Sequence, residues 1–255
     1  MLLTLPMYDY PEWRPATEAW ASAIARHAGV SVPLSRPEDY MGAWSRDDLL
    51  FSQTCGYPFT HAFRNRLNLI GTPHYAVPGC DAYLYSSFIF ARGKHRVQDC
   101  RGTVAVVNTP DSMSGMLALK HFFIGHAGGG TFFSRVVVSG GHVKSLEMLQ
   151  RGEADVCAID AVCVAYVRRY RPELLGGLHE LGSTPRVPGL PYVTRDQDIR
   201  RWQEAVAAAV ADPALSDVRE SLMIGGFTVT EPADYDVILR LEAAVMEKGG
   251  LFSLA

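Results

Sequence analysis

Short runs of apolar residues alternate along most of the chain with longer segments in which apolar residues recur at helical spacing. The short runs predict buried β-strands, at residues 2–7, 49–52, 67–75, 83–91, 104–107, 132–138, 156–159, 178–181 and 192–194. The longer segments predict amphipathic helices, at residues 15–27, 116–123, directly after His142, and at 161–169, 196–211, 213–223 and 232–248. Strands that alternate with helices indicate an α/β fold with a largely parallel sheet.

The chain is long enough for one large domain or for two lobes of ordinary size, with 255 residues. No internal repeat, low-complexity tract or long linker separates two sequential domains. If there are two lobes, the chain therefore crosses between them more than once. The strands near residues 83–91 and 182–191 are the predicted crossings.

Composition narrows the class of protein. A hydrophobic share of 48% and a charged share of 20% are typical of a soluble globular protein. The net charge of −3, without a basic cluster, gives no indication of a nucleic-acid partner. No apolar run approaches the roughly 18 residues of a membrane span, so we expect no membrane insertion.

The N-terminal segment has neither a basic stretch nor a long apolar one, so it does not resemble a secretory signal. We expect a cytoplasmic protein as the sequence stands, or a periplasmic one if a leader was removed. The five cysteines show no metal-ligand spacing, and a bridge between Cys55 and Cys80 is left open. We therefore expect no metal.

The most informative segment is the turn at residues 108–115, between the strand at 104–107 and the helix at 116–123. Free backbone N–H groups and the positive end of the helix dipole make a helix N-terminus a favourable place for an anion. Ser112 and Ser114 add two hydroxyls there. The alternative is that Ser112 or Asp111 only caps the helix.

Other polar side chains stand at comparable places. His142 follows a double glycine and precedes a helix, where it is either a donor to an oxyanion or a structural residue. Asp160 ends a strand, where it either balances a ligand amine or caps the next helix. Tyr8, Tyr57 and Tyr85 are either ligand walls or ordinary half-buried aromatics.

Six motifs in this order resemble one family. They are Pro-Met-Tyr-Asp-Tyr-Pro-Glu (6–12), Phe-Ser-Gln-Thr-Cys-Gly-Tyr-Pro (51–58), Asp-Ser-Met-Ser-Gly (111–115), Ser-Gly-Gly-His-Val-Lys-Ser-Leu (139–146), Gly-Glu-Ala-Asp-Val-Cys-Ala-Ile-Asp (152–160) and Thr-Pro-Arg-Val-Pro-Gly-Leu-Pro (184–191). Together they are similar to the phosphonate/phosphate-type substrate-binding proteins of ABC transporters, which have the type II periplasmic-binding-protein fold. The resemblance runs from Leu2 to about Thr194.

The resemblance implies two α/β lobes, each with a mostly parallel sheet, joined by a two-strand hinge that closes on a small ligand. It implies residues 1–86 plus 184–255 as lobe one and residues 87–183 as lobe two, with the ligand cleft between them. It implies an anionic group held by the turn, and walls formed by the other polar loops. The implied ligand-binding residues are Tyr8, Tyr57, Tyr85, Ser112, Met113 (through its N–H), Ser114, His142 and Asp160.

The function that follows is binding of a small anionic or zwitterionic metabolite, without a cofactor and without catalysis, as the receptor of an ABC-type uptake system. The partner would be an ABC permease, and the chain itself a monomer or weak dimer. Two departures keep alternatives open. Met113 stands where a small hydroxyl residue is typical of phosphonate binders, and the missing leader also suits a cytoplasmic enzyme of the menaquinone-biosynthesis type, or a cytosolic sensor, on the same fold.

Overall fold

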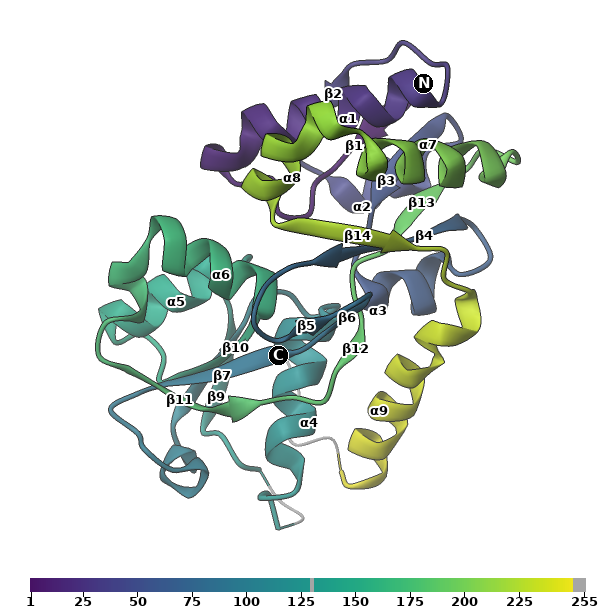
Figure 1. Cartoon of the computed structure of the whole chain (residues 1–255). Coiled ribbons are helices and arrows are strands. Elements are labelled where there is room, and N and C mark those ends of the chain that lie inside the picture. The colour runs from purple at the N-terminus through teal and green to yellow at the C-terminus, as the bar shows by residue number, and fades with distance from the viewer. Residues whose placement is uncertain (129–130, 250–255) are drawn as a thin grey trace. The chain divides into compact units, whose positions relative to one another are not determined.

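The computed structural model describes residues 1–128 and 131–249, and within them the chain forms two compact units (Figure 1). Unit 1 comprises Met1–Ala76, Cys80–Leu84 and Pro188–Tyr235. Unit 2 comprises Val77–Gly79, Tyr85–Val187 and the residues from Asp236 onward. The expected lobe one, residues 1–86 and 184–255, differs from unit 1, because residues 77–79, 85–86, 184–187 and the C-terminal helix group with unit 2.

Unit 1 is built on a six-stranded sheet in the order β14-β4-β13-β3-β1-β2. The strands are β1 (Leu2–Thr4), β2 (Leu34–Ser35), β3 (Leu49–Gln53), β4 (Asn68–Tyr75), β13 (Tyr192–Thr194) and β14 (Ile224–Thr228). Strand β1 runs parallel to β2 and β3, whereas β13 is antiparallel to β3 and β4, and β14 is antiparallel to β4.

The helices of unit 1 bury large aromatic residues against this sheet. They are α1 (Arg14–His27), α2 (Tyr40–Ser45), α3 (Gly56–Pro58), α7 (Ile199–Ala211) and α8 (Ser216–Leu222), with short turns η1 (Pro11–Trp13), η2 (Phe59–Phe63), η6 (Pro213–Leu215) and η7 (Pro232–Tyr235). Trp13, Trp20, Trp44 and Trp202 are all buried. The indole of Trp20 donates to the Tyr192 hydroxyl at 3.0 Å, and that of Trp44 donates to Ser52 Oγ at 3.0 Å, so burial leaves neither N–H without an acceptor.

Unit 2 is built on a five-stranded sheet in the order β11-β7-β10-β8-β9. The strands are β7 (Ser87–Arg92), β8 (Val104–Val107), β9 (Arg135–Val138), β10 (Val156–Asp160) and β11 (Leu178–Ser183). Strands β9, β8 and β10 are parallel neighbours, whereas β7 is antiparallel to β10 and β11.

The helices of unit 2 include one after each of its parallel strands. They are η3 (Val97–Cys100), η4 (Met113–Leu117), α4 (Ala118–Ile124), α5 (His142–Arg151), α6 (Ala161–Tyr170), η5 (Pro172–Leu175) and α9 (Asp236–Glu247). Helix α9 packs on α4. The core includes the buried rings of Phe123, Phe132 and Phe133, which meet with centroids 5.0–5.1 Å apart.

The sheets are mixed, which corrects the expectation of largely parallel ones. Strand β7 is the first long strand after the chain passes from Leu84 into unit 2, and β13 is the first after it passes from Val187 into unit 1. Each is antiparallel to both of its neighbours. A parallel neighbour requires a crossover connection, and these two strands enter their sheets without one.

Three short strands lie where the chain changes unit. They are β5 (Cys80–Asp81), β6 (Leu84–Tyr85) and β12 (Val187–Pro188), in the order β12-β6-β5. The apolar run 83–91, predicted as one strand, is therefore divided into β6 and β7. The hinge at this place stays a prediction. Among the described residues no disulfide forms, so Cys55 and Cys80 are not bridged.

Candidate functional site

Three parallel strands of unit 2 end at the same edge of its sheet. Val107 of β8 pairs with Val138 of β9, and Val106 of β8 pairs with Cys157 of β10. The loops that follow these strands lead into η4, α5 and α6. Ligands of open α/β sheets bind beyond the carboxyl ends of the strands, so this edge is the candidate binding site.

The turn after β8 contains groups that are hydrogen-bonded within the helix start and backbone N–H groups that are not. Ser112 Oγ accepts the N–H of Gly115 at 2.9 Å, and the Ser112 carbonyl accepts the N–H of Leu117 at 3.0 Å. Ser112 is therefore a helix cap, as the simpler interpretation held. The N–H groups of Met113 and Ser114 are the first of the helix and have no intrahelical acceptor. An anion beside the turn would find these donors.

Ser114 points to a residue from the next loop. Its Oγ lies 2.8 Å from Nε2 of His142, the first residue of α5. Ser114 is 4% exposed, so this contact is largely shielded from water. Two residues that are 28 positions apart in the sequence, and that both came from the motif analysis, thus meet at the edge of the sheet.

Asn108 is a residue that sequence reasoning missed. Its Nδ2 lies 3.4 Å from His142 Nε2, and its backbone carbonyl accepts the N–H of Gly140 at 2.8 Å. It therefore ties the turn after β8 to the turn after β9. The glycine at position 115 was the one sign of this role in the sequence. A Cβ at Gly115 would overlap Asn108 Oδ1 and would lie 2.7 Å from its Cγ. Only glycine leaves room for the asparagine side chain.

The imidazole of His142 is neutral at pH 7. Burial lowers the pKa of His142 to about 4, and the carbonyl of Ala158 acts weakly in the opposite direction. The residue as a whole is half-buried, but its Nδ1 is shielded from solvent and makes no hydrogen bond of normal geometry. Anion binding at this turn would therefore rely on dipoles and hydrogen bonds, without a resident positive charge on the histidine.

Asp160 caps helix α6. Its Oδ1 accepts the N–H groups of Val162 at 2.7 Å and Cys163 at 3.3 Å, and the residue is 1% exposed. The capping alternative is therefore observed at this position. Contact of the carboxylate with a ligand amine stays a prediction.

The three candidate tyrosines lie in different surroundings. Tyr8 belongs to unit 1, has a left-handed φ of 60°, and sets its ring edge-on to Tyr75 with centroids 5.3 Å apart. Tyr57, also in unit 1, stacks on His61 at 3.9 Å. Tyr85 belongs to unit 2 and is buried at 3% exposure. Unit 2 brings together Ser112, Met113, Ser114 and His142, and the ligand contacts of the tyrosines stay predictions.

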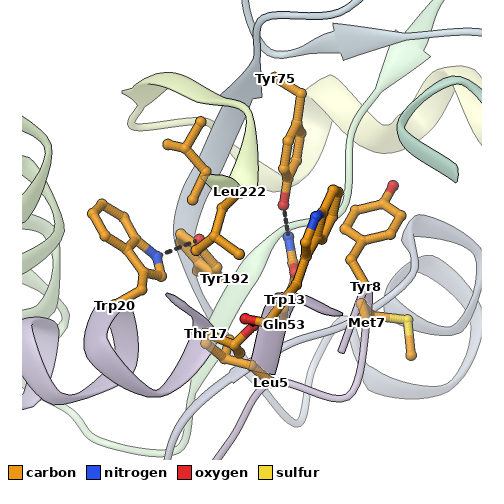
Figure 2. A pocket seen from close by; sticks show the side chains of 11 residues that line it. Leu5, Met7, Tyr8, Trp13, Thr17, Trp20, Gln53, Tyr75, Tyr192 and Leu222 are labelled. Atoms are coloured by element: carbon orange, nitrogen blue, oxygen red, sulfur yellow. Dashed lines mark hydrogen bonds between the residues drawn. The ribbon is translucent and has the colours of Figure 1, made fainter. Parts of the chain in front are cut away.

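A small pocket of unit 1 lies beside Tyr8 (Figure 2). The rings of Tyr8, Trp13 and Tyr75 line it, and Gln53 reaches in from β3. Gln53 Nε2 donates to the Tyr75 hydroxyl at 3.2 Å, as Figure 2 shows, and to the Leu190 carbonyl at 3.1 Å. The cavity of about 20 Å³ has room for about one water.

Residues 1–128 and 131–249 contain no cluster of three His, Cys, Asp or Glu side chains that could hold a metal ion. In the same ranges, no helix has both the length and the apolarity that a membrane crossing requires.

Comparison with known proteins gives a family and a fold. The model of the family "ABC transporter, phosphonate, periplasmic substrate-binding protein" matches residues 2–235. A search of curated protein sequences found no significant match.

Solved structures with the same fold share little sequence with this chain. The phosphonate-binding protein PhnD1 of Prochlorococcus marinus, in complex with methylphosphonate, is 13% identical with a TM-score of 0.75, and the match covers 96% of this chain and 98% of that one. The binding component of a phosphonate ABC transporter of Pseudomonas aeruginosa is 16% identical with a TM-score of 0.79, over 96% and 86% of the two chains. A Xanthomonas citri protein bound to ATP is 14% identical with a TM-score of 0.67, over 99% of both chains.

The family model covers nearly the whole described chain. The family consists of substrate-binding components of transporters and not of enzymes. The chain belongs to the periplasmic phosphonate substrate-binding protein family of ABC transporters.

Proposed function

We propose that this protein binds a small phosphonate-like anion, or a zwitterion with such an acidic group, and delivers it to an ABC permease. The observation that carries the proposal is the 2.8 Å contact between Ser114 Oγ and His142 Nε2 at the carboxyl edge of the unit 2 sheet. This contact lies beside the first N–H groups of a helix, in a chain that matches the family over residues 2–235.

The ligand class follows from the chemistry of the turn. Backbone N–H groups, the positive end of a helix dipole and the Ser112 hydroxyl, whose hydrogen is not used in the cap, favour a negatively charged oxygen. Asp160, placed at the end of the neighbouring strand, would favour a ligand that also carries an amine. Tyr8 and Tyr57 of unit 1, and Tyr85, are proposed ligand contacts on the strength of the family resemblance.

Titration calorimetry with methylphosphonate and with an aminoalkylphosphonate tests the proposal. A hydrogen bond to a charged group contributes roughly 1.5–3 kcal/mol, so Ser114→Ala should weaken binding by about tenfold or more. Ser134→Ala is the matched control, because this exposed serine of unit 2 donates only to the Thr103 carbonyl. The control variant should bind like the wild type.

A variant of Ser112 tests the capping role of the turn separately from the ligand contact of Ser114. Ser112→Ala removes the acceptor of the Gly115 N–H and should cost about 1 kcal/mol of stability. Ser114→Ala removes the hydrogen bond to His142 and should cost about as much, so the loss of affinity is what identifies Ser114 as a ligand contact. Unchanged affinity of the Ser114 variant for every phosphonate that the wild type binds would show that the turn is only a helix start. Mass spectrometry of a ligand that co-purifies with the protein would identify the natural one.

A further inference from the structure

The hydrogen bonds around His142 have a direction. The amide nitrogen of Asn108 lies 3.4 Å from Nε2 and can only donate a hydrogen bond. A neutral imidazole has one nitrogen that carries the proton and one that accepts. The ring proton therefore belongs on Nδ1, and Nε2 is an acceptor.

This tautomer determines what Ser114 offers to a ligand. A serine hydroxyl has one hydrogen and two lone pairs. Because Ser114 Oγ lies 2.8 Å from an accepting Nε2, its hydrogen is directed to the histidine. Toward any ligand beside the turn, Ser114 then presents lone pairs. Ser112 differs, because its Oγ accepts the Gly115 N–H and keeps its own hydrogen for donation.

We propose that this site selects a tetrahedral phosphorus oxyanion that carries one proton, whose P–O–H donates to Ser114 Oγ while Ser114 donates to His142 Nε2. The monohydrogen forms of a phosphonate and of a phosphate monoester share this chemistry. A sulfonate has no such proton at neutral pH, so it would place an oxygen lone pair against the lone pairs of Ser114. The inference rests on the proposed function, since it assumes that the anion is held at the turn of residues 112–115.

The titratable side chains around His142 do not supply this proton in place of the ligand. The titratable side chains on α5, on the elements packed against it and on the adjoining turn are Arg92, Asp111, Lys144, Glu147, Arg151, Cys157, Asp160, Cys163, Tyr166, Arg168, Arg169, Tyr170 and Glu173. None of these described side chains contributes to the pKa shift of His142, whose causes are burial and the Ala158 carbonyl. Asp160 turns its Oδ1 to the N–H groups of α6, and burial raises the pKa of the Cys157 thiol, which stays neutral.

The experiment is calorimetry of methylphosphonate and methyl phosphate, each in buffers that have the same pH but different ionisation enthalpies. At a pH above the second pKa of the ligand, binding to the wild type should take up close to one proton. At a pH where the ligand is already a monoanion, the uptake should fall toward zero. The two ligands separate the possible sources of the anion, because both have the required proton and only one is a phosphonate.

Methanesulfonate gives an independent measurement on the wild type. A site arranged to accept a hydroxyl proton rejects an analogue that lacks it, so methanesulfonate should bind at least about a hundredfold more weakly than the better phosphorus ligand. This comparison does not require any variant to fold.

Two glutamine variants test the role of the histidine. In His142→Gln the side-chain amide can donate to Ser114 Oγ, which releases the hydroxyl hydrogen for the ligand. Proton uptake should disappear, and the preference over methanesulfonate should shrink by about tenfold or more. His179→Gln is the matched control, because His179 lies on β11 at the opposite side of the sheet from β9. It should keep both properties.

The outcomes separate this inference from the function on which it rests. Tight binding of a phosphorus ligand without proton uptake at high pH, or equal binding of methanesulfonate, would overturn the inference and leave the proposed function intact. No binding of any phosphonate or phosphate ester to the wild type would overturn the proposed function, and this inference with it.

Discussion

The neutral, buried imidazole of His142 should make the stability of the protein depend on pH. Burial lowers its pKa from the ordinary value of 6.5 to about 4. Between these values the unfolded chain binds a proton that the folded chain does not, so acidification favours unfolding. A pKa difference of about 2.5 corresponds to about 3 kcal/mol, of which about 2.5 kcal/mol is lost by about pH 4.5. Above about pH 6.5 this contribution is fully present.

The other titrating groups either lose their contribution to stability at lower pH or affect wild type and variant equally. Ion pairs lower the pKa of Asp48 and Asp99 below their ordinary 3.8, so the stability they provide is lost only as the pH falls through lower values. Burial also lowers the pKa of His74 and His121, and their effect has the same sign as that of His142. It is common to wild type and variant, and therefore drops out of the difference.

The assay is urea unfolding of wild type and His142→Gln, followed by far-ultraviolet circular dichroism between about pH 7.5 and about pH 4.5. Glutamine fills a similar volume and does not titrate. The wild type should lose about 2.5 kcal/mol more than the variant over this range, whichever of the two is more stable at neutral pH. Parallel losses in the two proteins would refute the reasoning, because they would show that His142 is protonated in the folded state as readily as in the unfolded one.

The remaining predictions concern the same edge of the sheet. Gly115→Ala should cost about 1–3 kcal/mol, since the new Cβ would overlap Asn108 Oδ1, and adding Asn108→Ala should recover part of that stability in thermal melts. Asp160→Asn should keep the cap of α6, whereas Asp160→Ala should cost about 1 kcal/mol or more. If Asp160→Asn lowers the affinity for an aminoalkylphosphonate more than the affinity for methylphosphonate in calorimetry, Asp160 contacts the amine. Equal losses of affinity would exclude that contact.

Much of the fold could be predicted where an apolar run or a helical period is strong. Helices α1, α6 and α7 begin and end within a few residues of the predicted segments, and α5 begins where a helix was predicted. Strand β14 was missed, because it contains Gly225 and Gly226 in place of the β-branched residues that mark strands. A Cβ at Gly226 would lie 2.7 Å from Nδ1 of His74 on the neighbouring strand, so close packing requires the glycine that hides the strand.

The division of the run 83–91 could not be predicted, because its cause is not local. The backbone N–H of Ser86 donates to the carbonyl of Gly79 at 2.9 Å, and its hydroxyl donates to the same oxygen at 3.0 Å. A contact seven residues back in the sequence thus interrupts an otherwise continuous apolar segment. Hydrophobic periodicity carries no information about such a bond.

Part of the candidate site could also be predicted from local sequence, and part could not. Ser112 and Asp160 accept N–H groups two or three residues later in the helices that they cap, and local sequence was sufficient to predict both caps as alternatives. The contact of Asn108 with His142 spans 34 positions, and no spacing rule connects them. Only the pairing of β8 with β9 brings these two loops together.

The positions of the tryptophans allow fluorescence to distinguish the two units. All four indoles of the chain belong to unit 1, whereas the aromatic core described for unit 2 consists of phenylalanines, which emit weakly. Intrinsic fluorescence excited at the indole band therefore reports the unfolding of unit 1, while circular dichroism sums over both units. A substitution at His142 should displace the dichroism curve and leave the emission curve in place if the units melt independently, and should displace both equally if they melt as one cooperative block. The unmodified chain thus already carries the probe needed to measure how strongly its two halves are coupled.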